Sequence, residues 1–209
     1  MTPVIFKEKL FPIVDEGNKV VLIIIDNLRY DQWKAISSII SEYYLIKEEF
    51  IYSSILPTAT QYARNAMFAG LMPKEIQNLY PNIWLYDDEE GAKNLKEEDL
   101  FAFQLNRLGK KYKWHYEKIL NIKYSKKISD QYTMFSNFDL TILVYNFIDI
   151  LSHANTEIEV LRELADNDFA YRSVIVSWFK HSYLYELLKN LSVQNFYIIL
   201  TTDHGSIRV

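Results

Sequence analysis

Three short runs of mostly apolar residues punctuate the chain, and each ends in polar residues. The runs are KVVLIIID at 19–26, LTILVYNF within a segment at 139–147, and NFYIILTTDHG at 195–205. Consecutive apolar side chains are typical of strands that are buried on both faces, as in a parallel sheet. We expect two further strands, at 45–56, where LIKEEFIYSSIL includes polar positions, and at 110–119.

Between these runs, apolar residues recur at helical spacing. The pattern predicts an amphipathic helix at 29–44, a short helix and loop at 73–84, and further helices at 60–69, 87–109, 156–166 and 168–190. Strands that alternate with helices along a chain usually form a mostly parallel sheet, which is covered by helices. The predicted fold class is therefore α/β, with a mostly parallel sheet and helices on both faces.

The length of 209 residues suits one α/β domain, or one domain that carries an insertion. We interpret residues 1–18 as a linker or an N-terminal helix and 19–209 as the domain, with 74–136 as the candidate for a specificity insert. The chain ends four residues after Gly205, soon after the last predicted strand. We therefore expect the domain to be truncated at its C-terminus.

Composition narrows the classes of function. The net charge of −4 gives no overall signature of nucleic-acid or membrane binding. The absence of cysteine excludes disulfides and thiolate metal ligands, so any metal would be held by His, Asp, Glu, Thr or Ser. The N-terminus has no secretory signal, and VVLIIID is far shorter than the roughly 20 residues of a membrane-spanning helix. We expect a cytoplasmic protein that does not bind membranes.

Polar side chains gather where the predicted strands end. In open parallel sheets, ligands bind beyond the carboxyl ends of the strands. Taken alone, Asp26 and the threonines could each cap a helix, and an Asp-His pair four residues apart is common. Taken together, the set indicates a centre for zinc, manganese or a related divalent ion with oxygen and imidazole ligands. The residues are Asp26, Thr58, Thr60, Asp149, His153, Asp203 and His204.

This residue set suggests a phosphoryl-transfer chemistry. A divalent metal can favour the alkoxide of a threonine, and a second metal about 4 Å away can hold the opposite oxygen on phosphorus. The start of the predicted helix at Thr60 would present backbone N–H groups to phosphate oxygens. Arg64 and Asn65 on that helix could reach the phosphate, although a solvated arginine and a surface asparagine are equally consistent with the pattern.

Three segments carry a resemblance to a known family. VVLIIIDNLRYDQW, LPTATQYARNAMFAGLMP and ILTTDHG resemble the PglZ domain, a branch of the alkaline phosphatase superfamily. The closest likeness is to the C-terminal effector domain of PorX-type response regulators, and it covers nearly the whole chain. The resemblance implies an alkaline phosphatase-like core with two divalent metal ions, for which zinc is the expected metal.

The same resemblance implies roles for individual residues. Thr60 would be the nucleophile, because related nucleotide pyrophosphatases have P-T-x-T with the second threonine reacting, and here this motif is Pro57 to Thr60. Asp26, Asp203 and His204 would hold one metal together with Thr60. Asp149 and His153 would hold the other. The family supplies one more histidine downstream, and the chain stops at Val209 before such a position.

The resulting functional expectation is a metal-dependent phosphodiesterase, a hydrolase that acts on nucleotide-type phosphoesters. Likeness to PorX implies oligonucleotide or cyclic oligonucleotide signals, two-component signalling and a link to type IX secretion. It also implies a receiver domain or a regulatory protein as partner. A homodimer is a further expectation. One alternative is a non-catalytic nucleotide- or protein-binding module on this scaffold. Another is a different reaction of the superfamily, such as phosphomonoester hydrolysis or phosphate transfer between sugar positions. The tyrosines and tryptophans could stack on bases or belong to the core.

Overall fold

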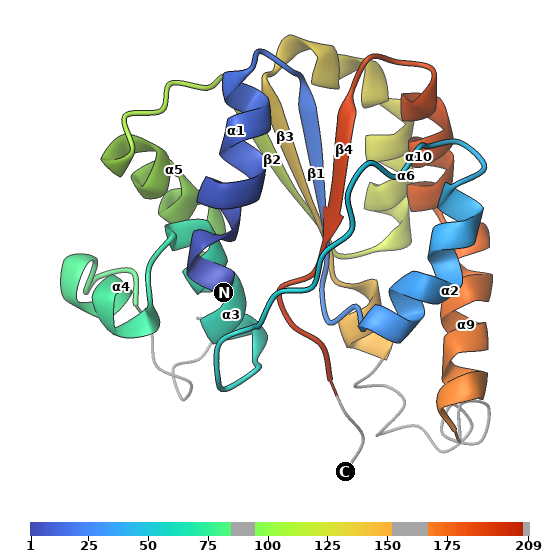
Figure 1. The fold of residues 1–209 in the computed structure, drawn as a ribbon, viewed down its shortest axis with the longest axis horizontal. Coiled ribbons are helices and arrows are strands. Elements are labelled where there is room, and N and C mark those ends of the chain that lie inside the picture. The colour runs from blue at the N-terminus through green and yellow to red at the C-terminus, as the bar shows by residue number, and fades with distance from the viewer. Residues whose placement is uncertain (85–94, 152–166, 207–209) are drawn as a thin grey trace.

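The computed structural model describes residues 1–84, 95–151 and 167–206. Its centre is a sheet of four strands in the order β2-β3-β1-β4, and every neighbouring pair is parallel. Helices cover both faces of this sheet (Figure 1), which confirms the predicted fold class. The strands are β1 (Val20–Ile25), β2 (Trp114–Ile119), β3 (Leu140–Tyr145) and β4 (Tyr197–Thr201).

One face of the sheet is covered by the N-terminal residues and three later helices, which lie to the left of the sheet in Figure 1. Buried phenylalanines dominate this layer: Phe6, Phe68 and Phe101 contact one another edge to face, with ring centroids 5.5 to 6.1 Å apart. The segments are Thr2–Val4, Phe6–Leu10, α1 (Phe11–Asp15), α3 (Thr60–Ala69), α4 (Pro73–Leu79) and α5 (Glu97–Arg107).

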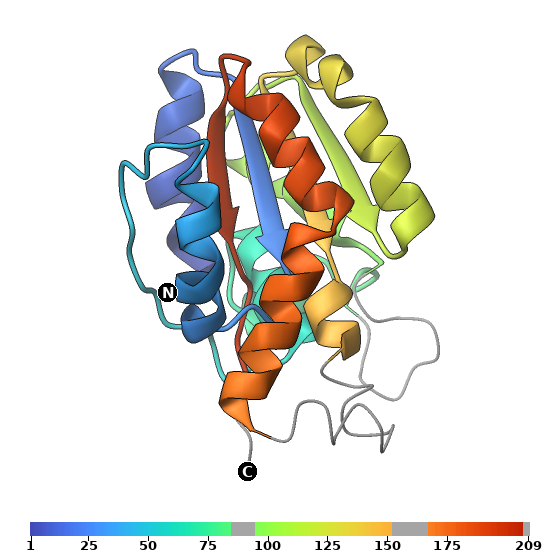
Figure 2. The same ribbon diagram turned by 90° about the vertical axis from the view of Figure 1, so that its right-hand side faces the viewer.

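The opposite face is covered by helices that Figure 2 brings to the front. Their apolar residues pack on the β1 side chains at alternate positions, Val21, Ile23 and Ile25, all of which are fully buried. The segments are α2 (Tyr30–Ile40), α6 (Ile122–Asp130), a 3-10 turn (Tyr132–Asn137), α9 (Asp168–Lys180) and α10 (Tyr183–Ser192).

Alternation along β1 divides the core into its two halves. Val20, Leu22 and Ile24 belong to the cluster under α3 and α5, whereas the odd-numbered residues belong to the cluster under α2 and α10. Successive side chains of a strand point to opposite faces of the sheet. A residue that follows Ile25 in extended conformation is therefore directed toward α3 and α5, which determines where the chemistry lies.

The predicted strand at 45–56 is wrong. Residues 45–55 form no strand in the structure and run along the outside of the sheet beside β4 (Figure 1). Lys47, Glu48 and Glu49 are exposed, and burying three consecutive charges in a parallel sheet would cost more than the strand pairing returns. The candidate strand at 110–119 is confirmed as β2, an edge strand paired with β3.

Two other ranges differ from the sequence pattern. The predicted helix at 168–190 is two helices, because Ser182 caps α10 by accepting from the Tyr185 N–H at 3.2 Å while its hydroxyl donates to Phe179 O at 2.7 Å. The range 74–136 contains α5 and the sheet strand β2, so it contributes to the central core.

The predicted helix at 156–166 lies outside the described residues. Within the described ranges, every helix is too short or too polar to cross a bilayer.

Candidate active site

Three polar side chains lie level with one another at the carboxyl ends of three adjacent strands, β3, β1 and β4. Ile25 is paired with Tyr145, and Ile24 with Thr201, so the same register places Asp26 beside Asn146 and Asp203. The Asp26 N–H donates to Tyr145 O at 2.9 Å, which continues the ladder by one residue. All three side chains point to the face that α3 and α5 cover. Ile24, Val144 and Ile199 pack on that face, and each polar residue lies an even number of positions after one of them.

Thr60 reaches this cluster from the first turn of α3. Its hydroxyl lies 3.0 Å from His204 Nε2 and donates toward Asp26 Oδ1 at 3.4 Å. The N-cap of α3 is Ala59, whose side chain makes no capping bond, so neither Thr58 nor Thr60 is the cap of this helix. Asp26 is no helix cap either, since α2 is capped at Arg29. Thr60 is partly exposed while Asp26 is fully buried, so the hydroxyl lies at the outer side of the cluster.

His204 is oriented by the backbone around it. Its own N–H donates to Asp203 Oδ1 at 3.0 Å, and its Nδ1 lies 3.3 Å from Gly205 O. This leaves Nε2 directed into the cluster, 3.6 Å from Asp26 Oδ1 and 3.8 Å from Asp203 Oδ2. The ring is 7% exposed.

The spacing of these atoms fits a metal ion. Ligands about 2.0 to 2.2 Å from a tetrahedral zinc ion lie about 3.3 to 3.6 Å from one another. The contacts among Thr60, His204 and the two aspartates run from 3.0 to 3.8 Å. Within the described residues, Asp26, Asp203 and His204 are the group whose ligand atoms all lie within 4.8 Å of one another. The donor set of two carboxylates, an imidazole and a hydroxyl therefore fits a divalent cation such as zinc.

Arg64 occupies the inner side of the same cluster, one turn along α3 from Thr60. Its side chain is fully buried, so the interpretation of a solvated arginine is wrong. The guanidinium forms ion pairs with Asp26 Oδ2 through Nη2 and with Asp203 Oδ2 through Nε at 3.1 Å. Burial opposes its charge, but the carboxylates of Asp203, Glu97 and Asp26 outweigh burial and raise the pKa of Arg64. The guanidinium is directed at carboxylates in this structure.

Glu97, at the start of α5, is the third carboxylate on Arg64. It is 1% exposed and lies 3.3 Å from Arg64 Nη1. Lys118 Nζ contacts the same Glu97 oxygen at 3.1 Å, and the Tyr116 hydroxyl donates to the other. Sequence reasoning missed Glu97, because it stands in an acidic run, KEEDLF, in which each residue has the same local pattern.

Asn146 is a second residue that sequence reasoning missed. Its amide donates to Asp26 Oδ2 at 3.0 Å, and its Oδ1 lies 3.5 Å from Arg64 Nη1. Its position directly after a buried strand was the available signal. Burial raises the pKa of Asp26, and the Asp203 charge adds to this effect, while the charge of Arg64 opposes it. Asp26 therefore depends on nearby cations and hydrogen-bond donors to stay charged.

The remaining predicted site residues are Asp149, His153 and Asn65. Asp149 lies in the helical turn that follows β3, and His153 lies outside the described residues, so the predicted second metal site stays a prediction. Asn65 is partly buried, and its amide oxygen is buried without a hydrogen-bond partner in the described part of the chain. Asn65 and Arg64 as phosphate ligands likewise stay predictions.

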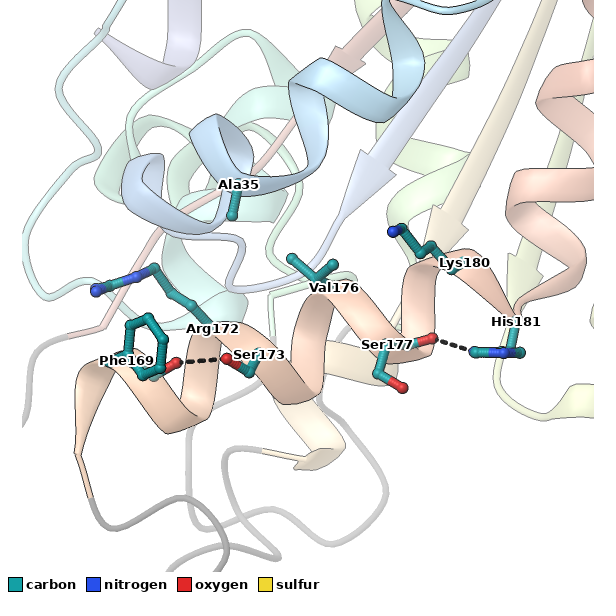
Figure 3. Close-up of a pocket in the computed structure, with 8 residues that line it drawn as sticks. All are labelled: Ala35, Phe169, Arg172, Ser173, Val176, Ser177, Lys180 and His181. Carbon is teal, nitrogen blue, oxygen red and sulfur yellow. Dashed lines mark hydrogen bonds between the residues drawn. The ribbon is translucent and has the colours of Figure 1, made fainter.

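A separate surface depression of about 430 Å³ lies between α2 and α9. The residues that line it are Ala35, Phe169, Arg172, Ser173, Val176, Ser177, Lys180 and His181. Figure 3 shows two hydrogen bonds there, which join Ser173 to Phe169 and His181 to Ser177 within one segment. The lining includes none of the Asp26 cluster. We therefore assign the candidate chemistry to the strand ends.

Comparison with known proteins identifies the family of the chain. A search of curated proteins finds none that matches the chain. A family model for the alkaline phosphatase-like domain of PglZ, from the BREX system, matches residues 5–209. The match covers nearly the whole chain, including the strands, α3 and the Asp-His pair. The chain therefore belongs to the PglZ family of alkaline phosphatase-like domains.

Proposed function

We propose that this protein is a metal-dependent phosphodiesterase with Thr60 as the nucleophile. The observation that carries the proposal is the contact of the Thr60 hydroxyl with His204 Nε2 at 3.0 Å and with Asp26 Oδ1 at 3.4 Å. A partly exposed hydroxyl beside buried metal-competent groups is the arrangement that nucleophilic phosphoryl transfer requires. Membership of an alkaline phosphatase-like family supports a phosphoesterase in general.

The residues that would hold a divalent metal are Asp26, Thr60, Asp203 and His204. When bound there, the metal supplies a lower pKa for the threonine hydroxyl and positive charge for the phosphate. His204 depends on Asp203 for its orientation, because its backbone N–H donates to that carboxylate. Asp26 Oδ1 accepts a hydrogen bond from the Thr60 hydroxyl, so the lone pairs of the threonine oxygen are directed outward. Zinc is the metal we propose, since three oxygens and one imidazole at these spacings suit it.

The start of α3 would receive the phosphate. Thr60 is the first residue of this ten-residue helix, and the positive end of the helix dipole faces whatever approaches its hydroxyl. Attack by the Thr60 oxygen forms a bond to phosphorus and breaks the bond to the leaving alcohol, which departs with a proton. Water then cleaves the bond between phosphorus and the Thr60 oxygen, which releases the phosphomonoester product and regenerates the hydroxyl.

A nucleotide-type phosphoester is the substrate class that we propose. Tyr62, two residues after Thr60, forms an aromatic pair with Trp84, with ring centroids 6.0 Å apart. Both side chains are partly exposed, so they offer a face on which a base can stack. A link to PorX-type signalling and secretion, a receiver or regulatory protein as partner, and a homodimer remain predictions from the resemblance.

The test is hydrolysis of bis(p-nitrophenyl) phosphate by zinc-loaded protein, with three variants. Thr60→Ala removes the nucleophile and should lower kcat at least about 1,000-fold. Thr60→Ser keeps a hydroxyl and should retain part of the activity. Thr58→Ala is the matched control, because Thr58 is exposed and precedes the helix, and it should leave kcat within about twofold.

Equal activity of Thr60→Ala and the parent chain would contradict the nucleophile assignment. An inactive parent chain that binds a nucleotide even with chelator present would instead indicate the non-catalytic binding module. Trp84→Ala separates the substrate proposal from the chemistry, since it should raise KM for p-nitrophenyl thymidine phosphate and leave bis(p-nitrophenyl) phosphate unaffected.

A further inference from the structure

Arg64 lies where a cation is needed between two carboxylates. Asp26 and Asp203 both turn their Oδ2 atoms to its guanidinium, and all three side chains are fully buried. The other oxygen of Asp26 faces Thr60 and His204. Two buried carboxylates that lie this close to one guanidinium would repel each other strongly without its positive charge. Arg64 therefore supplies the positive charge that a bound metal ion would otherwise supply.

The guanidinium is held by a second layer of residues. Glu97 accepts from Arg64 Nη1 at 3.3 Å and is itself held by Lys118 at 3.1 Å and by the Tyr116 hydroxyl. Three carboxylates against two cations leave the buried cluster with one negative charge in excess. A divalent ion entering beside His204 thus meets both the attraction of Asp26 and the repulsion of Arg64.

We propose that Arg64 is a built-in counter-ion which keeps Asp26 and Asp203 together in the metal-free chain and sets the metal affinity of the site, with Glu97 as its anchor. The inference rests on the metal site of the proposed function and adds a positioning role for two residues. Arg64 stabilises the metal-free form and, by its charge, lowers the affinity for the metal. Glu97 partly neutralises Arg64 and so raises that affinity.

This role predicts opposite signs for two neighbouring substitutions. In Arg64→Gln the repulsion on zinc is removed, and the affinity for zinc should rise by about tenfold. In Glu97→Gln the charge of Arg64 is no longer offset, and the affinity should fall by about tenfold. Arg64→Lys keeps the positive charge and should bind zinc with nearly the parent affinity. A purely structural arginine would instead give losses for both Arg64→Gln and Glu97→Gln.

The experiment is calorimetric titration of zinc into the chelator-stripped chain and these variants, with thermal unfolding midpoints recorded with and without zinc. The midpoint of Arg64→Gln in chelator should fall below that of the parent, and zinc should raise it by more than it raises the parent. Arg107→Gln is the control, because Arg107 contacts Tyr80 and Ala69 away from the cluster, and its zinc affinity should equal the parent's.

The outcomes separate the inference from the proposed function. If the parent binds zinc and both Arg64→Gln and Glu97→Gln weaken it, the counter-ion role is overturned and the metal site stands. If no form binds zinc, both are overturned. Should Arg64→Gln fail to fold, Glu97→Gln and Arg64→Lys decide: a weaker Glu97→Gln with an unchanged Arg64→Lys supports the inference, and any other combination overturns it.

Discussion

The hydroxyl of Thr60 lies 3.0 Å from Nε2 of His204, although 144 positions separate the two residues in the chain. The contact joins the start of α3 to the residues that follow β4, and Asp26 at the end of β1 lies between them. Neither residue alone indicates catalysis, since threonines and histidines are common in structural as well as catalytic positions. Their proximity to two buried aspartates is what marks the candidate site.

Removal of the imidazole should abolish tight zinc binding. We expect His204→Ala to lower zinc affinity by about 100-fold or more, because one of the proposed ligands is lost. His181→Ala is the matched control: His181 is exposed, and its ring contacts Ser177 O at 2.7 Å on the opposite face of the sheet. Elemental analysis gives the zinc content of both variants, and calorimetry gives their zinc affinity. Equal loss in the two variants, or none in His204→Ala, would remove His204 from the ligand set.

Asp31 should give the chain part of its resistance to acid. It joins α2 to α9 by accepting from Arg29 Nε at 2.9 Å and from Arg172 Nη1 at 2.9 Å. Partial burial raises the pKa of Asp31, but hydrogen bonds from the two arginines outweigh burial, so the pKa lies below its ordinary value of 3.8. A carboxyl with a lowered pKa in the folded state stabilises the fold above the unfolded value and loses this effect as pH falls through the folded value.

Asp31→Asn should therefore lower the free energy of unfolding by about 1 kcal/mol at pH 7, with allowance for screening at this partly exposed site. The difference from the parent should shrink as the pH falls below about 4. Asp130→Asn is the control, since Asp130 forms an exposed pair with Lys126, and it should change little at any pH. Urea unfolding at pH 3 to 7 measures the effect. A difference that is constant with pH would contradict the role of the carboxylate charge.

Gly70 should tolerate alanine worse than Gly109 does. Both glycines have left-handed backbones, with φ of 63° and 64°. A Cβ on Gly70 would lie 2.2 Å from Gln104 Nε2 and 2.8 Å from its Cδ, whereas nothing lies within 4 Å of one on Gly109. Gly109→Ala should cost about 1 kcal/mol from backbone strain alone. Gly70→Ala should cost about 2–4 kcal/mol, because overpacking against α5 is added.

Chemical unfolding of the two variants gives the comparison directly. Adding Gln104→Ala to Gly70→Ala should recover part of the loss, because the clash is with that side chain. Equal costs at Gly70 and Gly109 would mean that the Gln104 side chain moves aside without penalty.

The fold was predictable wherever burial is nearly uniform along a segment. β1 and β3 are runs of mostly β-branched and aliphatic residues, and they lie fully buried in the middle of the parallel sheet. β4 has a similar apolar run and was also predictable, but it lies at the sheet edge and is only half-buried. The segment 45–56 was misjudged because its alternation of apolar residues is interrupted by charges that water solvates better than a sheet does. β2 had a weaker pattern because its sequence, WHYEKI, carries His115, Glu117 and Lys118 among the apolar residues of a half-buried edge strand.

The candidate site was likewise predictable only in part. Asp26, Thr60, Asp203 and His204 could be singled out because they directly follow buried strands or begin a helix after a proline, and the sequence by itself therefore determined the chemistry that is present. Only the tertiary structure decided that Arg64 is buried between the aspartates and that Glu97 and Asn146 complete the cluster. The physical reason is that a charged side chain is exposed by default, and it becomes buried only when the register of distant strands brings opposite charges to it.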